Sequence, residues 1–143
     1  MKDNGRFILA IHMLTLLAEK QVPLSSNIIA LSAGVNAVTV RKLMGQLREA
    51  KLIHTQTGVK GGTTLAKDAS KITLKDVFMA VRDDSLFGVY SDNPSQECSV
   101  GRNLKSTLSH LLRDPVNSMI NSLDNITITD VLNGVLIPEI SSD

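Results

Sequence analysis

The chain has 143 residues, of which 43% are hydrophobic and 20% are charged. This length and composition suit one compact domain, or a small domain with an appended helix, and exclude an intrinsically disordered chain. A single cysteine excludes an internal disulfide framework. The sequence has neither a long uncharged apolar stretch nor a small-residue cleavage site near its N-terminus, so we expect no membrane span, no secretory signal and a cytoplasmic location.

The charges are unevenly distributed along the chain, although the formal net charge is only +1. Residues 36–67 contain six Lys and Arg against the single acid Glu49, a net charge of +5, while the rest of the chain sums to −4. A basic segment on an otherwise acidic body is typical of a phosphate-binding face, and a solvated helix face can produce part of it. The charge pattern therefore points to nucleic acid as a partner.

The first predicted element is a helix over residues 7–20. Its apolar side chains lie nearly all round the helix, so we expect it to be buried on several sides. Pro23 and Ser25 then break the chain before the next helix.

Residues 26–45 have the spacing of a helix-turn-helix. Ile29 and Ala30 fall on one face of a short helix, and Gly34 can adopt the left-handed conformation that ends it. Asn36 suits the N-cap of a second helix, whose apolar residues can pack back onto the first, namely Val40, Leu43 and Leu47. Because the second helix of this motif enters the major groove of DNA, the pattern predicts DNA binding.

A two-stranded hairpin is predicted directly after the helix pair. Residues 52–56 and 63–66 have the composition of strands, and the glycines within residues 58–62 suit the turn between them. A hairpin in this position is the wing of a winged helix. We expect the second helix to read the major groove and the wing to contact the adjacent backbone or minor groove.

The expected DNA-binding residues lie on the second helix and on the wing. Arg41 and Lys42 lie on the outer side of the helix beside the basic wing, which favours DNA contact over a purely solvated role. Asn36 suits capping at least as well as base reading, and Lys60 is also suited to keeping the hairpin tip soluble. The full expected set is Asn36, Val38, Thr39, Arg41, Lys42, Arg48, Lys60, Gly61 and Gly62.

Two further helix starts follow from capping-box patterns. Thr73 with Asp76, and Thr127 with Asp130, have the spacing in which each side chain bonds the backbone N–H of the other residue. Between them, residues 86–97 have the composition of a loop.

A long amphipathic helix is predicted over residues 100–123. Pro115 lies inside it and should kink or interrupt the helix near Asp114. Its leucines give it an apolar stripe suited to packing against another helix.

Five segments in order resemble the Rrf-two family of bacterial winged-helix regulators, related to the iron-sulfur cluster regulator IscR, and within it the YwnA-like branch. The most specific is the wing signature GVKGGTTLA, and the five segments are residues 38–53, 58–66, 72–81, 98–104 and 126–132. The resemblance implies a mostly α fold with a small β-hairpin, a winged helix-turn-helix with a long C-terminal dimerisation helix. It also implies a homodimeric transcription regulator, usually a repressor, whose partner is double-stranded DNA.

Within that fold we expect three parts. Residues 1–82 form the winged helix-turn-helix DNA-binding domain, residues 83–98 a loop, and residues 99–143 the dimerisation helix and a C-terminal segment. The expected dimer contacts include Leu104, Leu108 and Leu111.

The family's cluster-binding members use three cysteines and a further ligand, often a His three residues after the last Cys. This chain has only Cys98, with Gly101 in the position of that His, so one thiolate cannot hold a cluster and we expect none. We expect no other cofactor either. The three histidines share no ligand spacing, and we expect no metal site. Cys98 has two interpretations: a semi-buried packing residue, or an oxidant-sensing thiol whose thiolate a helix N-terminus favours.

No pattern indicates an enzyme, because the glycines of the wing lie in a hairpin and the sequence has no nucleophile with a base, metal set or phosphate loop. The alternatives are a winged-helix protein-interaction module and a thiol-based redox-sensing regulator acting through Cys98. The basic segment favours DNA over the interaction module. A small-molecule effector is the other candidate signal, held between the winged domain and the long helix beside Leu86, Phe87, Val89 and Tyr90.

Overall fold

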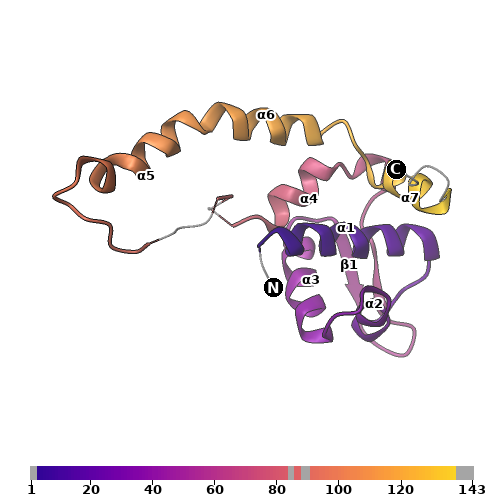
Figure 1. The fold of residues 1–143 in the computed structure, drawn as a ribbon. Helices are drawn as coiled ribbons and strands as arrows, with labels where there is room; N and C mark the ends of the chain where they lie inside the picture. The colour runs from indigo at the N-terminus through magenta and orange to yellow at the C-terminus, as the bar shows by residue number, and fades with distance from the viewer. Residues whose placement is uncertain (1–2, 84–85, 88–90, 138–143) are drawn as a thin grey trace.

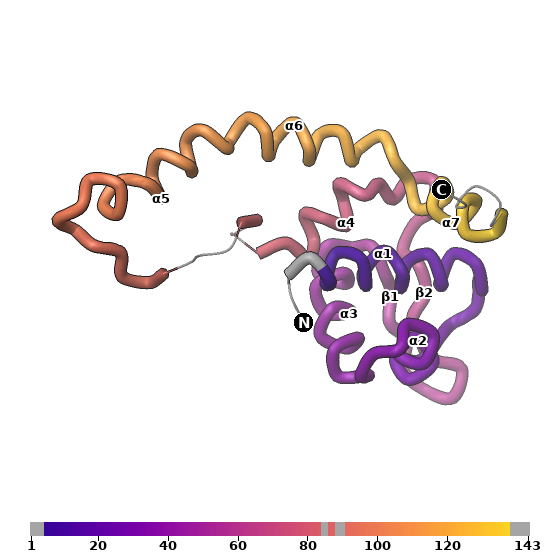
Figure 2. The backbone as a smooth tube through the Cα atoms, in the orientation of Figure 1, coloured from indigo at the N-terminus to yellow at the C-terminus, as the bar shows by residue number. Residues whose placement is uncertain are grey.

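The computed structural model describes residues 3–83, 86–87 and 91–137. A winged-helix core carries a helical arm that extends away from it (Figures 1 and 2). The elements in chain order are α1 (Asp3–Lys20), α2 (Ser26–Ala33), α3 (Ala37–Glu49), β1 (Ile53–Gln56), β2 (Gly62–Leu65), the short 3-10 helix η1 (Ala69–Lys71), α4 (Leu74–Val81), α5 (Ser99–Leu111), α6 (Arg113–Leu123) and α7 (Ile128–Leu136). The expected mostly α fold with one small hairpin is confirmed.

The helix-turn-helix is formed by α2 and α3, which meet at a bend of 112°. Gly34 ends α2 with φ of 68°, a left-handed conformation that costs glycine little. Asn36 begins α3, where its side-chain oxygen accepts the Val38 N–H at 2.8 Å. The turn between the two helices and the cap that starts α3 are both confirmed.

The core lies around α1. Ala10, Met13 and Leu14 on this helix are fully buried, as the apolar residues on nearly all of its sides predicted. Helices α2, α3, α4 and α7 all pack against it, and Phe7 meets Phe78 of α4 edge to face with ring centroids 5.4 Å apart. No single helix among the described residues has the length and hydropathy needed to cross a membrane.

The wing is the antiparallel pair β1 and β2, in which Ile53 lies opposite Leu65 and Gln56 opposite Gly62. Its strands are within one residue of their predicted bounds. Two backbone hydrogen bonds between Leu24 and Thr63, of 3.1 and 2.8 Å, attach β2 to the segment before α2. The wing is thereby fixed relative to the helix-turn-helix.

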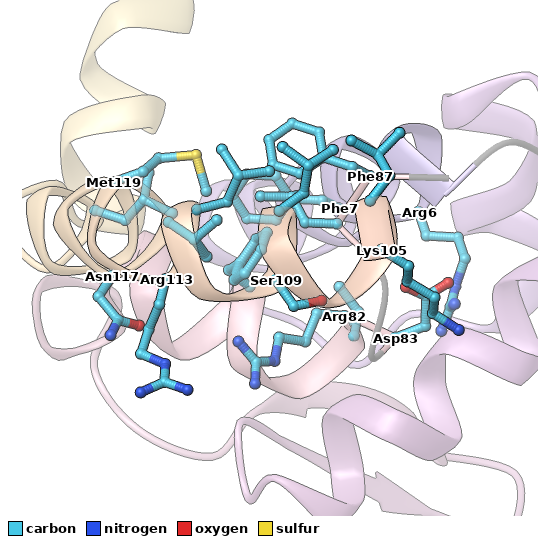
Figure 3. Close-up of a pocket in the computed structure, with 18 of the residues that line it drawn as sticks. Arg6, Phe7, Arg82, Asp83, Phe87, Lys105, Ser109, Arg113, Asn117 and Met119 are labelled. Carbon is cyan, nitrogen blue, oxygen red and sulfur yellow. The ribbon is translucent and has the colours of Figure 1, made fainter. Parts of the chain in front are cut away.

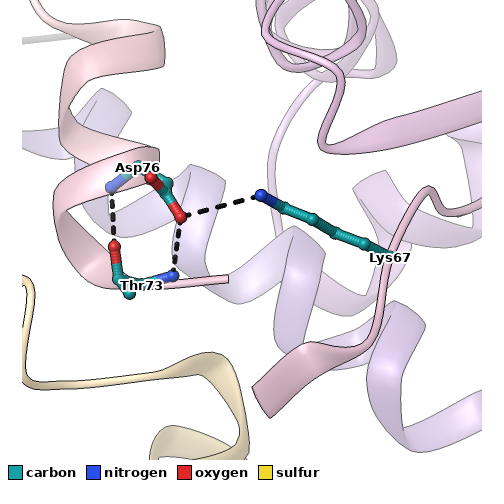
Figure 4. Close-up of polar contacts among 3 residues, drawn as sticks. All are labelled: Lys67, Thr73 and Asp76. Carbon is teal, nitrogen blue, oxygen red and sulfur yellow. Dashed lines mark hydrogen bonds and ion pairs between the residues drawn. The ribbon is translucent and has the colours of Figure 1, made fainter. Parts of the chain in front are cut away.

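Helices α4 and α7 begin side by side. Both capping boxes are present, and Figure 4 shows the reciprocal bonds between Thr73 and Asp76. The Leu74 N–H donates to the Ile126 carbonyl at 2.8 Å, and the Ile128 N–H donates to the Ile72 carbonyl at 2.9 Å. Helix α7 then packs on α1 and η1. The chain thus returns from the arm to the core at residues 126–128.

The arm consists of α5 and α6, which together cover the interrupted helix expected over residues 100–123. The break falls at Leu112, because the ring of Pro115 crowds the carbonyl of Leu111 four residues earlier and offers no N–H to bond it. The predicted interruption is therefore confirmed, two residues before Asp114. Helix α6 packs on α4, whereas α5 has no buried side chain. Of the predicted loop, residues 86–87 and 91–97 form neither helix nor strand, and the rest lies outside the described residues.

The docking of α7 on α1 predicts a large effect at Ile128, whose side chain is fully buried. We expect Ile128→Ala to lower the free energy of unfolding by about 2–5 kcal/mol, because it removes buried methyl groups and leaves a cavity. Val135→Ala on the same helix removes a side chain that is 58% exposed and should change stability by about 0.5 kcal/mol or less. Urea denaturation followed by circular dichroism measures both, and equal effects would mean that α7 is not part of the core.

Candidate nucleic-acid interface

Helix α3 has one buried face and one open face. Val40, Leu43 and Leu47 are at most 2% exposed and hold the inner face against the core. Arg41 and Lys42 are exposed on the outer face, as expected. The outer face is therefore free to contact a partner along the length of the helix.

The residues at the start of α3 have distinct environments. Asn36 caps α3, which confirms one of its two expected roles. Base reading by Asn36 stays a prediction. Val38 is 64% exposed and Thr39 is half-buried. All three lie in the first turn of the helix or just before it.

Arg48 connects the end of α3 to the wing. Its guanidinium donates to the Thr55 hydroxyl of β1 at 3.1 Å, on the exposed surface. This contact positions a cation between the outer face of α3 and the hairpin. The sequence predicted Arg48 as a basic residue of the site but not its bond to Thr55, because Thr55 lies on a different element.

The wing tip is a tight turn that presents Lys60. The Gly61 N–H donates to the Gly58 carbonyl at 3.0 Å, which leaves Val59 and Lys60 exposed at the tip. A side chain on Gly61 would overlap the Gln56 carbonyl. One on Gly62 would approach backbone atoms of Leu24 to 2.9–3.0 Å. Both glycines thus have a backbone role in shaping the wing, and their contact with DNA stays a prediction.

Lys67 is the one basic residue of the segment that is paired with an acid among the described contacts. Its Nζ lies 4.0 Å from Oδ2 of Asp76, the carboxylate that also caps α4 (Figure 4). The charge of Lys67 is thus directed at α4, although the sequence grouped it with the basic residues of α3 and the wing.

A contact that the sequence did not indicate joins α1 to α3. The Arg6 guanidinium donates to the Gln46 side-chain oxygen at 2.8 Å, across 40 positions of the sequence. No periodicity or local motif relates two residues at this separation. The bond ties the last turns of α3 to the N-terminal part of α1.

A cavity of about 1060 Å³ lies between the arm and the core. Figure 3 shows Phe7 and Met119 on its apolar wall and Arg6, Arg82 and Lys105 around it. Leu86 and Phe87 line it, as the expected effector site required, whereas Val89 and Tyr90 lie outside the described residues. The expected dimer contacts are open on α5: Leu104 is half-buried, Leu108 is 40% exposed and Leu111 is 62% exposed.

Cys98 lies at the N-cap of α5 and is exposed, so it is not the semi-buried packing residue of the first interpretation. Hydrogen bonds from the Gly101 and Val100 N–H groups lower the pKa of its thiol below the ordinary value, because they stabilise the thiolate. The environment is polar and open to solvent. It matches the second interpretation better than the first.

An iron-sulfur cluster does not fit this site. Cys98 is the only cysteine in the sequence, and a Cβ on Gly101 would lie 2.6 Å from the Ser95 carbonyl oxygen, so a side chain at the position of the family's His would require the backbone at Ser95 to shift. Among the described residues, no group of three or more His, Cys, Asp or Glu could hold a metal ion. The donor set falls short of the four protein ligands that a cluster usually needs.

Comparison with known proteins identifies the fold and the family. The family model Rrf2, described as an iron-dependent transcriptional regulator, matches residues 4–134. YwnA of Bacillus subtilis (strain 168), a candidate HTH-type transcriptional regulator, is 34% identical over 131 residues, which span 91% of this chain and 96% of YwnA.

Two solved structures share the architecture. The crystal structure of a candidate DNA-binding protein is 31% identical with a TM-score of 0.70, over 89% of this chain and 98% of that one. IscR of T. potens is 22% identical with a TM-score of 0.64, over 94% and 88%, and shows the fold alone. The resemblance and the winged helix are confirmed, and the family consists of transcriptional regulators rather than enzymes. The chain therefore belongs to the Rrf2 family of transcriptional regulators.

Proposed function

We propose that the chain is a homodimeric DNA-binding repressor of the cytoplasm, in which α3 enters the major groove and the wing contacts the neighbouring backbone or minor groove. The observation that carries this proposal is the outer face of α3, where Arg41 and Lys42 are exposed while the opposite face is buried in the core. Arg48 and Lys60 extend the same positive charge toward the wing. A duplex is the partner whose charge and groove shape suit such a face.

The arm supports dimerisation. Helix α5 has no buried side chain, and its leucines form an apolar stripe that extends to the exposed Leu111. Burial of that stripe against a second copy removes apolar surface from water, at about 25 cal/mol per Å². A two-fold dimer also places two α3 helices at successive major grooves, about 34–36 Å apart.

The exposed Cys98 with its lowered thiol pKa favours oxidant sensing as an additional function of the regulator. A thiolate reacts with peroxide to give sulfenic acid, which can change the start of α5. The cavity between arm and core supports the other candidate, a small-molecule effector.

The charges on α3 predict how mutation changes DNA affinity. Arg41→Ala with Lys42→Ala should weaken binding strongly and leave the fold intact, and each lost phosphate contact should reduce the slope of log affinity against log salt by about one. The control, Lys20→Ala with Lys71→Ala, removes two charges from α1 and η1. Fluorescence anisotropy over a salt series measures the slopes, and wild-type affinity in the α3 variant would exclude this helix as the DNA contact.

The arm predicts the oligomeric state. Leu108→Asp should give a monomer or an insoluble chain, because a carboxylate cannot be buried in an apolar helix interface without a partner. Ser106→Asp on the opposite side of α5 should leave the dimer unchanged. Sedimentation measures both at micromolar concentration, where a monomeric wild type would contradict the proposed dimer.

The two candidate signals give opposite predictions for Cys98→Ser: the thiol model predicts a variant that no longer responds to oxidant, and the effector model predicts a variant that responds to its signal as the wild type does. Under the thiol model the variant binds DNA normally but, unlike the wild type, keeps it after hydrogen peroxide treatment, since a serine cannot form sulfenic acid. Ser99→Ala is the neighbouring control and should respond as the wild type does. Anisotropy before and after treatment decides between them, and DNA binding of the wild type that peroxide does not change would remove the thiol model.

A further inference from the structure

The outer face of α3 has exposed cations on either side of a line that runs from Val38 to Gly45. Val38 and Gly45 are seven residues apart, close to two helical turns, so they lie on one line along the helix. Arg41 and Lys42 project on either side of that line and are exposed. Between Val38 and Gly45 the line thus carries only short side chains and lies between two cations, and the exposed Glu49 continues it one turn beyond Gly45.

No contact among the described residues requires a glycine at position 45. A Cβ built there meets no atom within 4 Å, so neither the core nor another helix needs the space. Its φ is not positive, unlike those of Gly34, Gly58 and Gly62. Glycine is the least favourable residue in a helix interior after proline, because it loses the most backbone freedom. A glycine at position 45 therefore lowers the stability of α3 and gains no packing contact among the described residues.

Gly134 offers a direct comparison. It also lies inside a helix, α7, and a Cβ there also meets no atom within 4 Å. By contrast, Cβ atoms on Gly61, Gly62 and Gly101 would come within 3 Å of backbone atoms. Gly45 and Gly134 thus lower the stability of their helices in the same way, but only Gly45 lies between the cations of α3.

Val38 is an apolar side chain held in place on the open surface. It is 64% exposed, and its backbone N–H is bonded to the Asn36 side chain, which fixes the first turn of the helix. Branching at Cβ restricts Val38 to one preferred rotamer in a helix. The apolar group that a base edge presents in the major groove is the thymine C5 methyl. An ordered, exposed valine on a DNA-facing helix is complementary to that group.

Resting on the proposed DNA-binding function, we propose that the line from Val38 to Gly45 faces the bases in the major groove. Val38 packs against a thymine methyl and so selects an A·T pair. Gly45 lets the backbone of α3 approach the base edges closely, while Arg41 and Lys42 bind the phosphates on the two sides. An alanine methyl at position 45 would hold the helix away from the groove.

The first test compares Gly45→Ala with Gly134→Ala, using the duplex that the wild-type protein enriches most from a random-sequence library. Both variants should raise the melting temperature, because alanine favours helix. Gly45→Ala should bind the duplex about tenfold more weakly, and Gly134→Ala within about twofold of the wild type. A Gly45→Ala variant that melts at a higher temperature but binds more weakly indicates close approach to the DNA. A structural role of Gly45 would instead lower both the melting temperature and the affinity. If Gly45→Ala binds as the wild type does, the proposed line is wrong, whereas a wild type that enriches no duplex contradicts the proposed function itself.

The second test replaces single thymines of that duplex by uracil, which removes only the methyl group. At one position in each half-site the wild type should lose about threefold to tenfold in affinity, and Val38→Ala should lose nothing further there. Leu31→Ala truncates an apolar side chain of α2 that is 85% exposed and should keep the wild-type response to uracil. Equal losses for Val38→Ala and the wild type at every thymine would exclude Val38 as the reader of that methyl.

Discussion

The burial of one face of α3 is the constraint on which the rest of the interface depends. Val40, Leu43 and Leu47 are almost fully removed from water, and each such side chain contributes about 1.5–3 kcal/mol relative to exposure. Rotation of α3 about its axis would expose this stripe and bury Arg41 or Lys42 in the core. The packing therefore fixes the direction of the outer face, so the positions of the cations follow from the apolar residues.

The arm differs from α3, because its helix α5 has no buried face. Helix α6 packs on α4, and the backbone bonds of Leu74 with Ile126 and of Ile128 with Ile72 return the chain to the core, yet α5 has no buried side chain. A single chain thus buries a core around α1 but buries no side chain of α5. After α5 the arm is attached to the winged core by the packing of α6 on α4 and by the segment that leads into α7, so a partner on α5 would act on a helix joined to the DNA-binding unit.

Features set by residues close in sequence could be predicted. The cap at Asn36, the left-handed Gly34 and the capping box of Thr73 each depend on neighbours within four residues, so local chemistry determines them. The docking of α7 on α1 and the bond from Arg6 to Gln46 depend on which distant segments meet, which no local pattern encodes. Within the candidate site, the sequence predicted the helices and the hairpin. It did not predict the exposure of Cys98, which depends on how the start of α5 packs. Contact of each expected residue with DNA stays a prediction.

The central claim is that two copies of this chain present two α3 helices to one face of a duplex. Hydroxyl-radical footprinting on the genomic fragments that the protein retains measures this arrangement directly. The account predicts two protected regions on the same face of the DNA, with centres one helical turn apart, about 10–10.5 base pairs, or a multiple of it. Protection of a single half-site, or uniform weak protection with no preferred sequence, would contradict it.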